Sequence, residues 1–352
     1  MEEFSKIRFE SDYQEGCHPK ILERICNSNL EQTSGYGVDY HCENAANLIR
    51  NLIAKPEAQI FFLTGGTQAN AAVIKHLLKP YEGVICASSG HINVHESGAI
   101  EATGHKVIAL ENSNGLLKPE LLRNYLENFY SDPTFDHMVQ PGLVYISQPS
   151  ECGTIYSKKM LQDLRKICDE YALKLFLDGA RLGVGLTSSE NDLSACDIAN
   201  LCDVFYFGGT KLGALFGEAV VFPNPKLAKN FRILMKQQGA LLAKGRLLGV
   251  QFESLFENGR ESLYYEIAQK ENTQALKIKR AFQEKGINLL YDSYTNQQFP
   301  ILTQSQYDEL SRNFVFELWQ KLDNGNLAAR FCTSWATSDD NINSLVNAIK
   351  EL

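Results

Sequence analysis

The stretch Asp203-Val-Phe-Tyr-Phe-Gly-Gly-Thr-Lys-Leu-Gly-Ala214 contains a short apolar run followed by a glycine-rich turn that carries one lysine, Lys211. An apolar run of this length is typical of a buried strand in an α/β sheet. Upstream, the run 174–178 ends in Asp178. Because open α/β sheets bind ligands at the carboxyl ends of their strands, we expect Lys211 and Asp178 to lie at such ends and to contact one ligand.

The surrounding sequence predicts the rest of this sheet. Short β-rich runs alternate with helical patterns from residue 60 to residue 222, as a doubly wound sheet covered by helices requires. The predicted strands are 59–64, 83–87, 143–147 and 174–178, and the predicted helices include 68–74 and 160–168. We therefore predict an α/β fold with a mostly parallel central sheet.

The C-terminal third has a different pattern. After about residue 245 there are long charged helices, short apolar runs at 299–302 and 330–333, and a terminal helix after Ser338. A chain of 352 residues also exceeds the usual limit for one core. We expect a large domain over 1–245 and a smaller α/β domain over 246–352, without a flexible linker between them.

Composition narrows the classes of partner. The net charge of −8 and the pI near 5.5 argue against a nucleic-acid partner. No apolar run approaches the roughly 20 residues that span a bilayer, and residues 1–6 lack a targeting pattern, so we expect a cytoplasmic protein without a membrane partner. Nine scattered cysteines without a Cys-x-x-Cys pair predict small core residues rather than disulfides or a thiolate zinc site. The expected partner is a small molecule.

Lys211 and Asp178 are the pair that pyridoxal phosphate needs, an amine for its aldehyde and a carboxylate for its ring nitrogen. The turn 64–67 joins a predicted strand to a helix, so its N–H groups and the Thr67 hydroxyl can bind a phosphate, with Thr210 as a second hydroxyl. Each feature has a simpler alternative: an ordinary tight turn at 64–67, a surface position for Lys211, and a cap or turn role for Asp178.

Two histidines and two arginines are further candidates. His91 and His95 lie four residues apart, on one helical face, but no third ligand follows at a recognisable spacing, and we predict no metal site. His91 could instead lie flat against a cofactor ring, and His95 could be a core residue. Arg181 and Arg330 adjoin predicted strands, where a guanidinium can grip a substrate carboxylate or remain a surface charge.

The motifs in series resemble those of threonine aldolases. The matching segments, in the family's order, are 11–13, 35–39, 65–70, 89–92, 177–182, 210–214, 235–239 and 330–335. The resemblance covers nearly the whole chain. It implies a fold-type-I pyridoxal-phosphate enzyme of the β-eliminating lyase superfamily, which cleaves β-hydroxy-α-amino acids such as threonine and allo-threonine into glycine and an aldehyde.

The resemblance also implies roles for individual residues. Lys211 would bond the cofactor, Asp178 would pair with its ring nitrogen and His91 would stack on the ring. The remaining roles concern anionic groups. The cofactor phosphate would be bound by Gly66, Thr67 and Thr210, and the substrate carboxylate by Ser11, Arg181 and Arg330. Lys236 stands where the family usually has arginine, and it would bind the phosphate in a neighbouring subunit. The assembly would be a homodimer or homotetramer.

One departure from the family leaves the reaction open. Many threonine aldolases carry a histidine in the loop that here reads Ser-Gln-Pro-Ser-Glu-Cys-Gly-Thr over 147–154. Glu151 is a candidate substitute as a base, and His91, or a water that it positions, is another. The alternatives to the aldolase are β-elimination or transamination on the same scaffold, and a metabolite-binding protein without catalysis.

Overall fold

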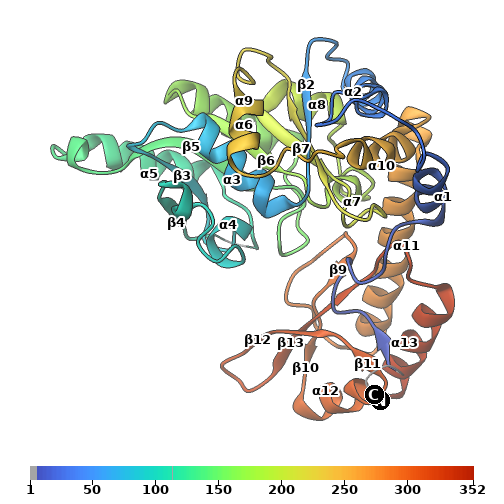
Figure 1. Ribbon diagram of the computed structural model, residues 1–352. Helices are drawn as coiled ribbons and strands as arrows, with labels where there is room; N and C mark the ends of the chain where they lie inside the picture. Colours follow the sequence, from blue (N-terminus) through green and yellow to red (C-terminus); the bar gives the residue numbers. More distant parts are fainter. Residues whose placement is uncertain (1–5, 113) are drawn as a thin grey trace.

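The computed structural model describes residues 6–112 and 114–352, and a seven-stranded sheet forms its larger part (Figure 1). The strand order is β2-β8-β7-β6-β5-β3-β4, and β8 is antiparallel to both of its neighbours while the other pairs are parallel. The strands are β2 Gln59–Leu63, β3 Glu82–Ala87, β4 Val107–Leu110, β5 Gln140–Ser147, β6 Lys174–Asp178, β7 Val204–Gly208 and β8 Glu218–Phe222. The prediction of a mostly parallel α/β sheet is confirmed.

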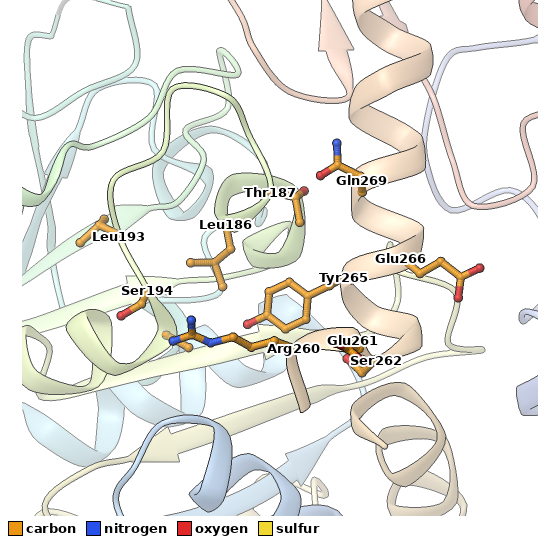
Figure 2. A pocket seen from close by; sticks show the side chains of 11 residues that line it. Leu186, Thr187, Leu193, Ser194, Arg260, Glu261, Ser262, Tyr265, Glu266 and Gln269 are labelled. Atoms are coloured by element: carbon orange, nitrogen blue, oxygen red, sulfur yellow. The ribbon is translucent and has the colours of Figure 1, made fainter. Parts of the chain in front are cut away.

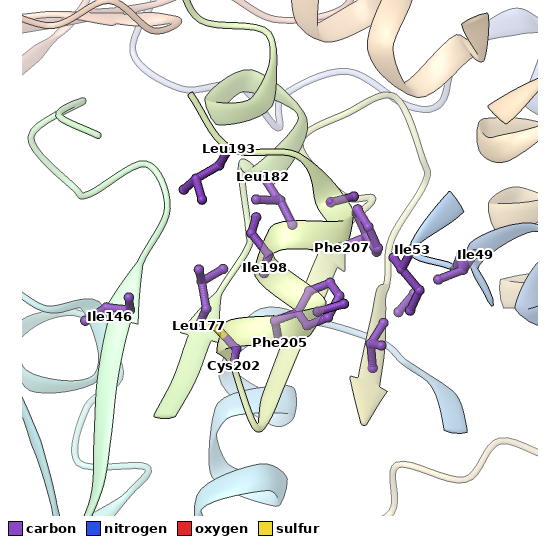
Figure 3. Packing of buried hydrophobic residues seen from close by; sticks show 14 of the residues in the cluster. Ile49, Ile53, Ile146, Leu177, Leu182, Leu193, Ile198, Cys202, Phe205 and Phe207 are labelled. Atoms are coloured by element: carbon purple, nitrogen blue, oxygen red, sulfur yellow. The ribbon is translucent and has the colours of Figure 1, made fainter. Parts of the chain in front are cut away.

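Helices cover both faces of this sheet. They are α1 Pro19–Asn27, α2 Tyr40–Leu52, α3 Gly66–Leu77, α4 His91–Val94, α5 Pro119–Ser131, α6 Lys158–Glu170, α7 Leu182–Leu186, α8 Ala195–Leu201, α9 Phe231–Gln237 and α10 Arg246–Phe256. Because successive side chains of a strand point to opposite faces, β7 contributes Phe205 and Phe207 to one core and Tyr206 to the other. Figure 3 shows the first core, where both phenylalanines pack near Ile53 at the end of α2. The strand is apolar on both sides because both sides are covered.

The C-terminal part forms a smaller α/β unit that connects to the large sheet through the long helix α11, Leu263–Glu284 (Figure 1). Its strands are β9 Gln297–Gln298, β10 Ile301–Leu302, β11 Phe314–Val315, β12 Glu317–Lys321 and β13 Leu327–Cys332, and its other helices are α12 Gln304–Ser311 and α13 Asp339–Glu351. The N-terminal strand β1, Ile7–Arg8, pairs with β11, and Phe9 joins the core of this unit. The division of the chain after residue 245 stays a proposal.

Most local predictions are confirmed. The predicted helices 68–74 and 160–168 lie within α3 and α6, Ser338 caps α13, and β6 spans the predicted 174–178. The predicted strand 299–302 is shorter: only Ile301–Leu302 belongs to a strand, since Pro300 has no N–H to donate to a ladder.

The remaining expectations concern cysteines and membranes. All nine cysteines are free, and most of them are buried. Within the described residues, no helix is both long and apolar enough to cross a membrane. The targeting prediction depends on the first residues of the chain, and residues 1–5 lie outside the described part.

Candidate active site

A cavity of about 280 Å³ lies at the carboxyl ends of β2, β5, β6 and β7. The structure places on its wall seven of the residues selected from the sequence: Gly66, Thr67, His91, Asp178, Arg181, Thr210 and Lys211. Residues far apart in the chain meet here because parallel strands end at the same edge of a sheet. The close approach of β6 and β7 requires Gly208, since a Cβ atom there would lie 2.3 Å from the carbonyl oxygen of Ala180.

Asp178 is the buried acid of this cavity, and three donors hold its carboxylate. Its Oδ2 accepts hydrogen bonds from Asn70 Nδ2 at 2.9 Å and from the Tyr145 hydroxyl at 2.6 Å, and its Oδ1 accepts from the Ala180 N–H at 3.0 Å. Burial by itself would raise the pKa of Asp178, but the nearby His91 ring and the hydrogen bonds from Tyr145 and the Ala180 N–H act against it, and the pKa is lowered. The group is therefore ionised and suited to a cationic ring nitrogen.

His91 begins α4 and is oriented by a second buried acid. Its Nδ1 lies 2.8 Å from Glu96 Oε1, which also accepts a hydrogen bond of 2.8 Å from Asn70 Nδ2. Asn70 thus links the carboxylates of Asp178 and Glu96. Sequence reasoning assigned roles to neither Asn70, Glu96 nor Tyr145. A signal for Asn70 existed, because it is a polar residue on the buried face of α3, between Ala69 and the apolar residues that follow.

Lys211 projects into the cavity from the turn after β7. Burial lowers the pKa of its amine, and the nearby charge of Arg181 lowers it further. A lowered pKa increases the fraction of neutral amine, which is the form that attacks an aldehyde. The Tyr13 ring centroid lies 5.9 Å from Lys211 Nζ, at the mouth of the same cavity.

The turn between β2 and α3 provides a cradle for an anion. Helix α3 begins at Gly66, and its N-cap residue Gly65 makes no side-chain capping hydrogen bond, so no capping side chain stands between the first N–H groups and a ligand. Space is available, since a Cβ atom on Gly65 would meet nothing within 4 Å. An amine, an ionised carboxylate and this helix N-terminus within one cavity fit pyridoxal phosphate, with Lys211, Asp178 and the turn as its three holding points.

A second cavity of about 260 Å³ adjoins the first and shares His91, Glu151 and Lys211 with it. Arg330 lies on its wall with a partly occupied guanidinium. Nη1 donates to Gln297 Oε1 and Nη2 to the Glu10 carbonyl, each at 3.1 Å, and Nη2 also pairs with Glu317. Its Nε is buried and has no partner among the described residues.

Arg181 forms a two-point ion pair with the buried acid Asp12. Its Nε and Nη2 donate to the two carboxylate oxygens of Asp12, at 2.5 and 3.0 Å. Burial by itself would raise the pKa of Asp12. The charge of Arg181 and its hydrogen bonds to the carboxylate outweigh burial and lower the pKa to about 2. Arg181 Nη1 has no hydrogen-bond partner among the described residues, and Arg181 lies on the walls of both cavities. Both terminal nitrogens of Arg330 have protein partners, so a ligand would have to displace one of them. The short-range sequence around Arg181 contains no sign of its distant partner Asp12.

Two of the selected residues lie apart from both cavities. Ser11 is on neither wall. Lys236 is exposed on α9, where its Nζ lies 4.4 Å from the Tyr36 ring centroid. The role of Lys236 toward a neighbouring subunit stays a prediction.

Glu151 takes a central place in the loop where the family's histidine is missing. Its Oε1 accepts hydrogen bonds from the His91 N–H at 3.0 Å and from Ser147 Oγ at 2.7 Å. Burial raises the pKa of this carboxyl group. It lies on the walls of both cavities and can therefore exchange a proton near a bound ligand.

A larger cavity, of about 640 Å³, lies between α7 and the start of α11 (Figure 2). Arg260 and Tyr265 project toward it, but its described lining contains no lysine, histidine or aspartate. Nor do the described residues contain a group of three or more His, Cys, Asp or Glu side chains arranged for a metal ion. The chemistry of this chain is concentrated in the two smaller cavities.

Comparison with known proteins agrees with this geometry. The family model described as beta-eliminating lyase matches residues 9–305. The low specificity L-threonine aldolases of a Pseudomonas species and of Pseudomonas aeruginosa are 29% and 28% identical, each over 97% of both chains. The solved threonine aldolase of Leishmania major is 43% identical, with a TM-score of 0.94 over 98% of this chain and 99% of that one.

More distant structures share the fold alone. An aspartate aminotransferase from Thermus thermophilus superposes with a TM-score of 0.73 over 99% of this chain and 91% of that one, at 14% identity. The architecture is that of fold-type-I pyridoxal-phosphate enzymes. The chain belongs to the β-eliminating lyase family and, within it, to the threonine aldolases.

Proposed function

We propose that this protein is a pyridoxal-phosphate-dependent aldolase that cleaves β-hydroxy-α-amino acids of the threonine type into glycine and an aldehyde. The observation that carries the proposal is the meeting of Lys211, Asp178 and the N-terminus of α3 in one cavity of a threonine aldolase fold. Bound pyridoxal phosphate supplies an electron sink for the bond that breaks. The protein supplies the binding, the orientation and the proton transfers.

Each part of the cofactor has a proposed partner. Lys211 offers a neutral amine to the aldehyde, and Asp178 keeps the ring nitrogen protonated through its ionised carboxylate. His91 lies against the ring, with its orientation set by Glu96. The phosphate is held by the N–H groups and hydroxyls of Gly66, Thr67 and Thr210.

The second cavity is the proposed site of the substrate. Arg330 binds the substrate carboxylate in place of Glu317, and Arg181, on the wall of the same cavity, is the second proposed donor. The role of Ser11 rests on the resemblance alone. With pyridoxal phosphate bound, a clamped carboxylate would fix the orientation of the substrate, and that orientation would decide which of its bonds breaks. Since His91 Nδ1 is occupied by Glu96, its Nε2 is the atom that takes the proton of the β-hydroxyl group, directly or through a water. Glu151 is the alternative base.

The proposed assembly is a homodimer or homotetramer in the cytoplasm. Tyr36 and Lys236 lie together, and Val38, Tyr40 and Ile233 are all strongly exposed on the same two chain segments. A neighbouring copy that covers this surface would bring Lys236 to its phosphate site. Free cysteines throughout the chain are consistent with a reducing compartment.

The assembly is tested by light scattering combined with activity. We expect a dimer or tetramer at assay concentrations, because closed symmetric oligomers are the usual state of soluble chains and Lys236 has a role only across subunits. When Lys236 is replaced, the control for a general charge effect is the replacement of Lys229, an exposed lysine also close to α9. A fully active monomer would contradict the proposal.

The reaction is tested by identifying the products. With threonine or allo-threonine the enzyme is expected to release acetaldehyde and glycine in equal amounts. Because the loop 147–154 lacks a histidine, larger β-hydroxy amino acids belong in the same panel. If none of them yields glycine while serine or cysteine yields pyruvate, the protein catalyses β-elimination instead; accumulation of the cofactor's amine form would indicate transamination.

A further inference from the structure

Glu218 is a buried acid in the wall of the cofactor cavity that the proposed mechanism does not use. It is the first residue of β8 and is 3% exposed. It pairs in register with Leu63, the last residue of β2, immediately before the turn that forms the phosphate cradle. An acid at this position faces a site proposed for an anion, and that conflict requires an explanation.

The explanation begins with Thr210, which contacts the acid and lines the same cavity. Thr210 Oγ1 accepts a hydrogen bond from the Gly217 N–H at 2.9 Å and lies 3.2 Å from Glu218 Oε1. A hydroxyl has one proton to donate and two lone pairs to accept with. If Glu218 is ionised it can only accept, so Thr210 must give it that proton. Thr210 then has no proton left for a phosphate, which is itself an acceptor.

A protonated Glu218 removes the conflict. The carboxylic acid donates to Thr210 Oγ1, which then accepts two hydrogen bonds, from Glu218 and Gly217, and has its own proton free for the phosphate. The other carboxyl oxygen, Oε2, is buried without a partner among the described residues. An unpaired buried oxygen costs less on a neutral carboxyl group than on a carboxylate, which also favours the protonated form.

The groups around Glu218 favour a proton at neutral pH. Burial raises the pKa of Glu218 to about 8; the amine of Lys211 opposes this increase and the carboxylate of Asp178 on β6 adds to it. Tyr206 on β7 and Tyr264 on α11 are buried and neutral, since their own pKa values are raised by burial. Helix α10 presents apolar side chains beside the strand.

We propose that Glu218 is a positioning residue that carries a proton whenever the cavity holds a phosphate group, and that it acts by donating to Thr210 and turning the Thr210 hydroxyl toward that phosphate. The inference rests on the proposed cofactor. It makes phosphate binding dependent on pH: binding is strong while Glu218 is protonated, below its pKa, and weakens as the pH rises through that value.

The test measures affinity for pyridoxine 5′-phosphate, which has an alcohol in place of the aldehyde and cannot bond to Lys211. A phosphate monoester with a second pKa near 6 is already a dianion throughout pH 7 to 9.5. For the unsubstituted apoprotein, the loss of one proton with a pKa of about 8 is expected to raise Kd by about tenfold between pH 7 and pH 9.

The matched variant is Glu218→Gln, whose amide always donates to Thr210 and carries no charge. We expect it to bind as tightly as the unsubstituted protein at pH 7 and about tenfold more tightly at pH 9. Because the charges of Lys211 and Glu218 affect each other, the two proteins are also compared in a Lys211→Ala background, where the difference between their pH profiles belongs to Glu218. Parallel profiles would overturn the proposal, as would a folded Glu218→Gln protein that binds poorly at pH 7.

Calorimetry gives a second measurement that needs no change at Glu218. Binding at pH 8.5, measured in two buffers with different heats of ionisation, is expected to take up most of one proton at Glu218, in addition to any proton taken up by the ring nitrogen of the ligand. Thr210→Val is expected to remove the part that belongs to Glu218. Unchanged uptake in Thr210→Val would contradict the route through Thr210. If no form of the protein binds pyridoxal phosphate at any pH, the proposed cofactor itself is wrong, which is a different outcome from parallel profiles.

Discussion

Replacing Lys211 by alanine is expected to lower turnover by about 10³-fold or more, equivalent to about 4 kcal/mol. The physical reason is the setting of the amine. Lys211 lies in the same cavity as the acid Asp178, and its lowered pKa increases the fraction of the neutral, nucleophilic form. Turnover with threonine is the first measurement. The second is borohydride reduction, which should attach the cofactor covalently to the peptide that contains Lys211.

The matched control is Lys229→Ala, because Lys229 is an exposed lysine outside both cavities. It is expected to remain yellow, active and labelled at Lys211. Labelling of another lysine in the unsubstituted protein would show that Lys211 has been assigned wrongly. A colourless protein that cannot be reconstituted with pyridoxal phosphate would contradict the cofactor as well.

Arg330→Ala is expected to reduce turnover by about 30- to 1,000-fold, or roughly 2–4 kcal/mol, while the protein keeps its yellow colour. Arg330 lies in the adjoining cavity, away from the α3 turn, so its loss removes the grip on the substrate carboxylate and leaves the cofactor in place. Steady-state kinetics combined with the absorbance spectrum separate these two effects.

Two further variants show whether the geometry of Arg330 matters. Arg330→Lys keeps the charge but loses the fork of donors, and it should recover only part of the lost turnover. Arg312→Ala removes an exposed arginine at the C-terminal end of α12, outside both cavities, and should leave turnover unchanged. If Arg330→Ala keeps full turnover, the carboxylate is bound elsewhere, and Arg181 would be the next residue to test.

Local sequence patterns were sufficient to predict five strands of the sheet and to select Asp178 and Lys211, whereas β4 and the antiparallel strand β8 were not predicted. The apolar runs before Asp178 and Lys211 are short because each forms one buried strand. Each run ends at the carboxyl end of its strand, where the chain leaves the sheet. The strand-to-helix turn at 64–67 shows the same regularity. These features depend on neighbours along the chain, so a single sequence contains them.

The hydrogen-bond partners of these residues were decided by the tertiary structure alone. Asn70 and Asp178 are 108 residues apart, and Asp12 and Arg181 are 169 apart. Contacts between residues so far apart in the chain depend on the strand order and on the packing of helices against the sheet. Neither can be predicted from the local periodicity of the sequence.

The two arginines illustrate the limit. From the sequence, Arg181 and Arg330 were equivalent candidates for the substrate carboxylate, each beside a strand. In the folded chain, Arg181 is paired with Asp12 through Nε and Nη2, whereas Nη1 and Nη2 of Arg330 both have partners and its buried Nε has none among the described residues. The sequence by itself predicted that both guanidiniums adjoin strands, where they can bind a carboxylate or remain surface charges. Only the tertiary structure decided that Arg181 is paired with Asp12 and Arg330 with Glu317, because the partner of a charge is the nearest opposite charge in space and not along the chain.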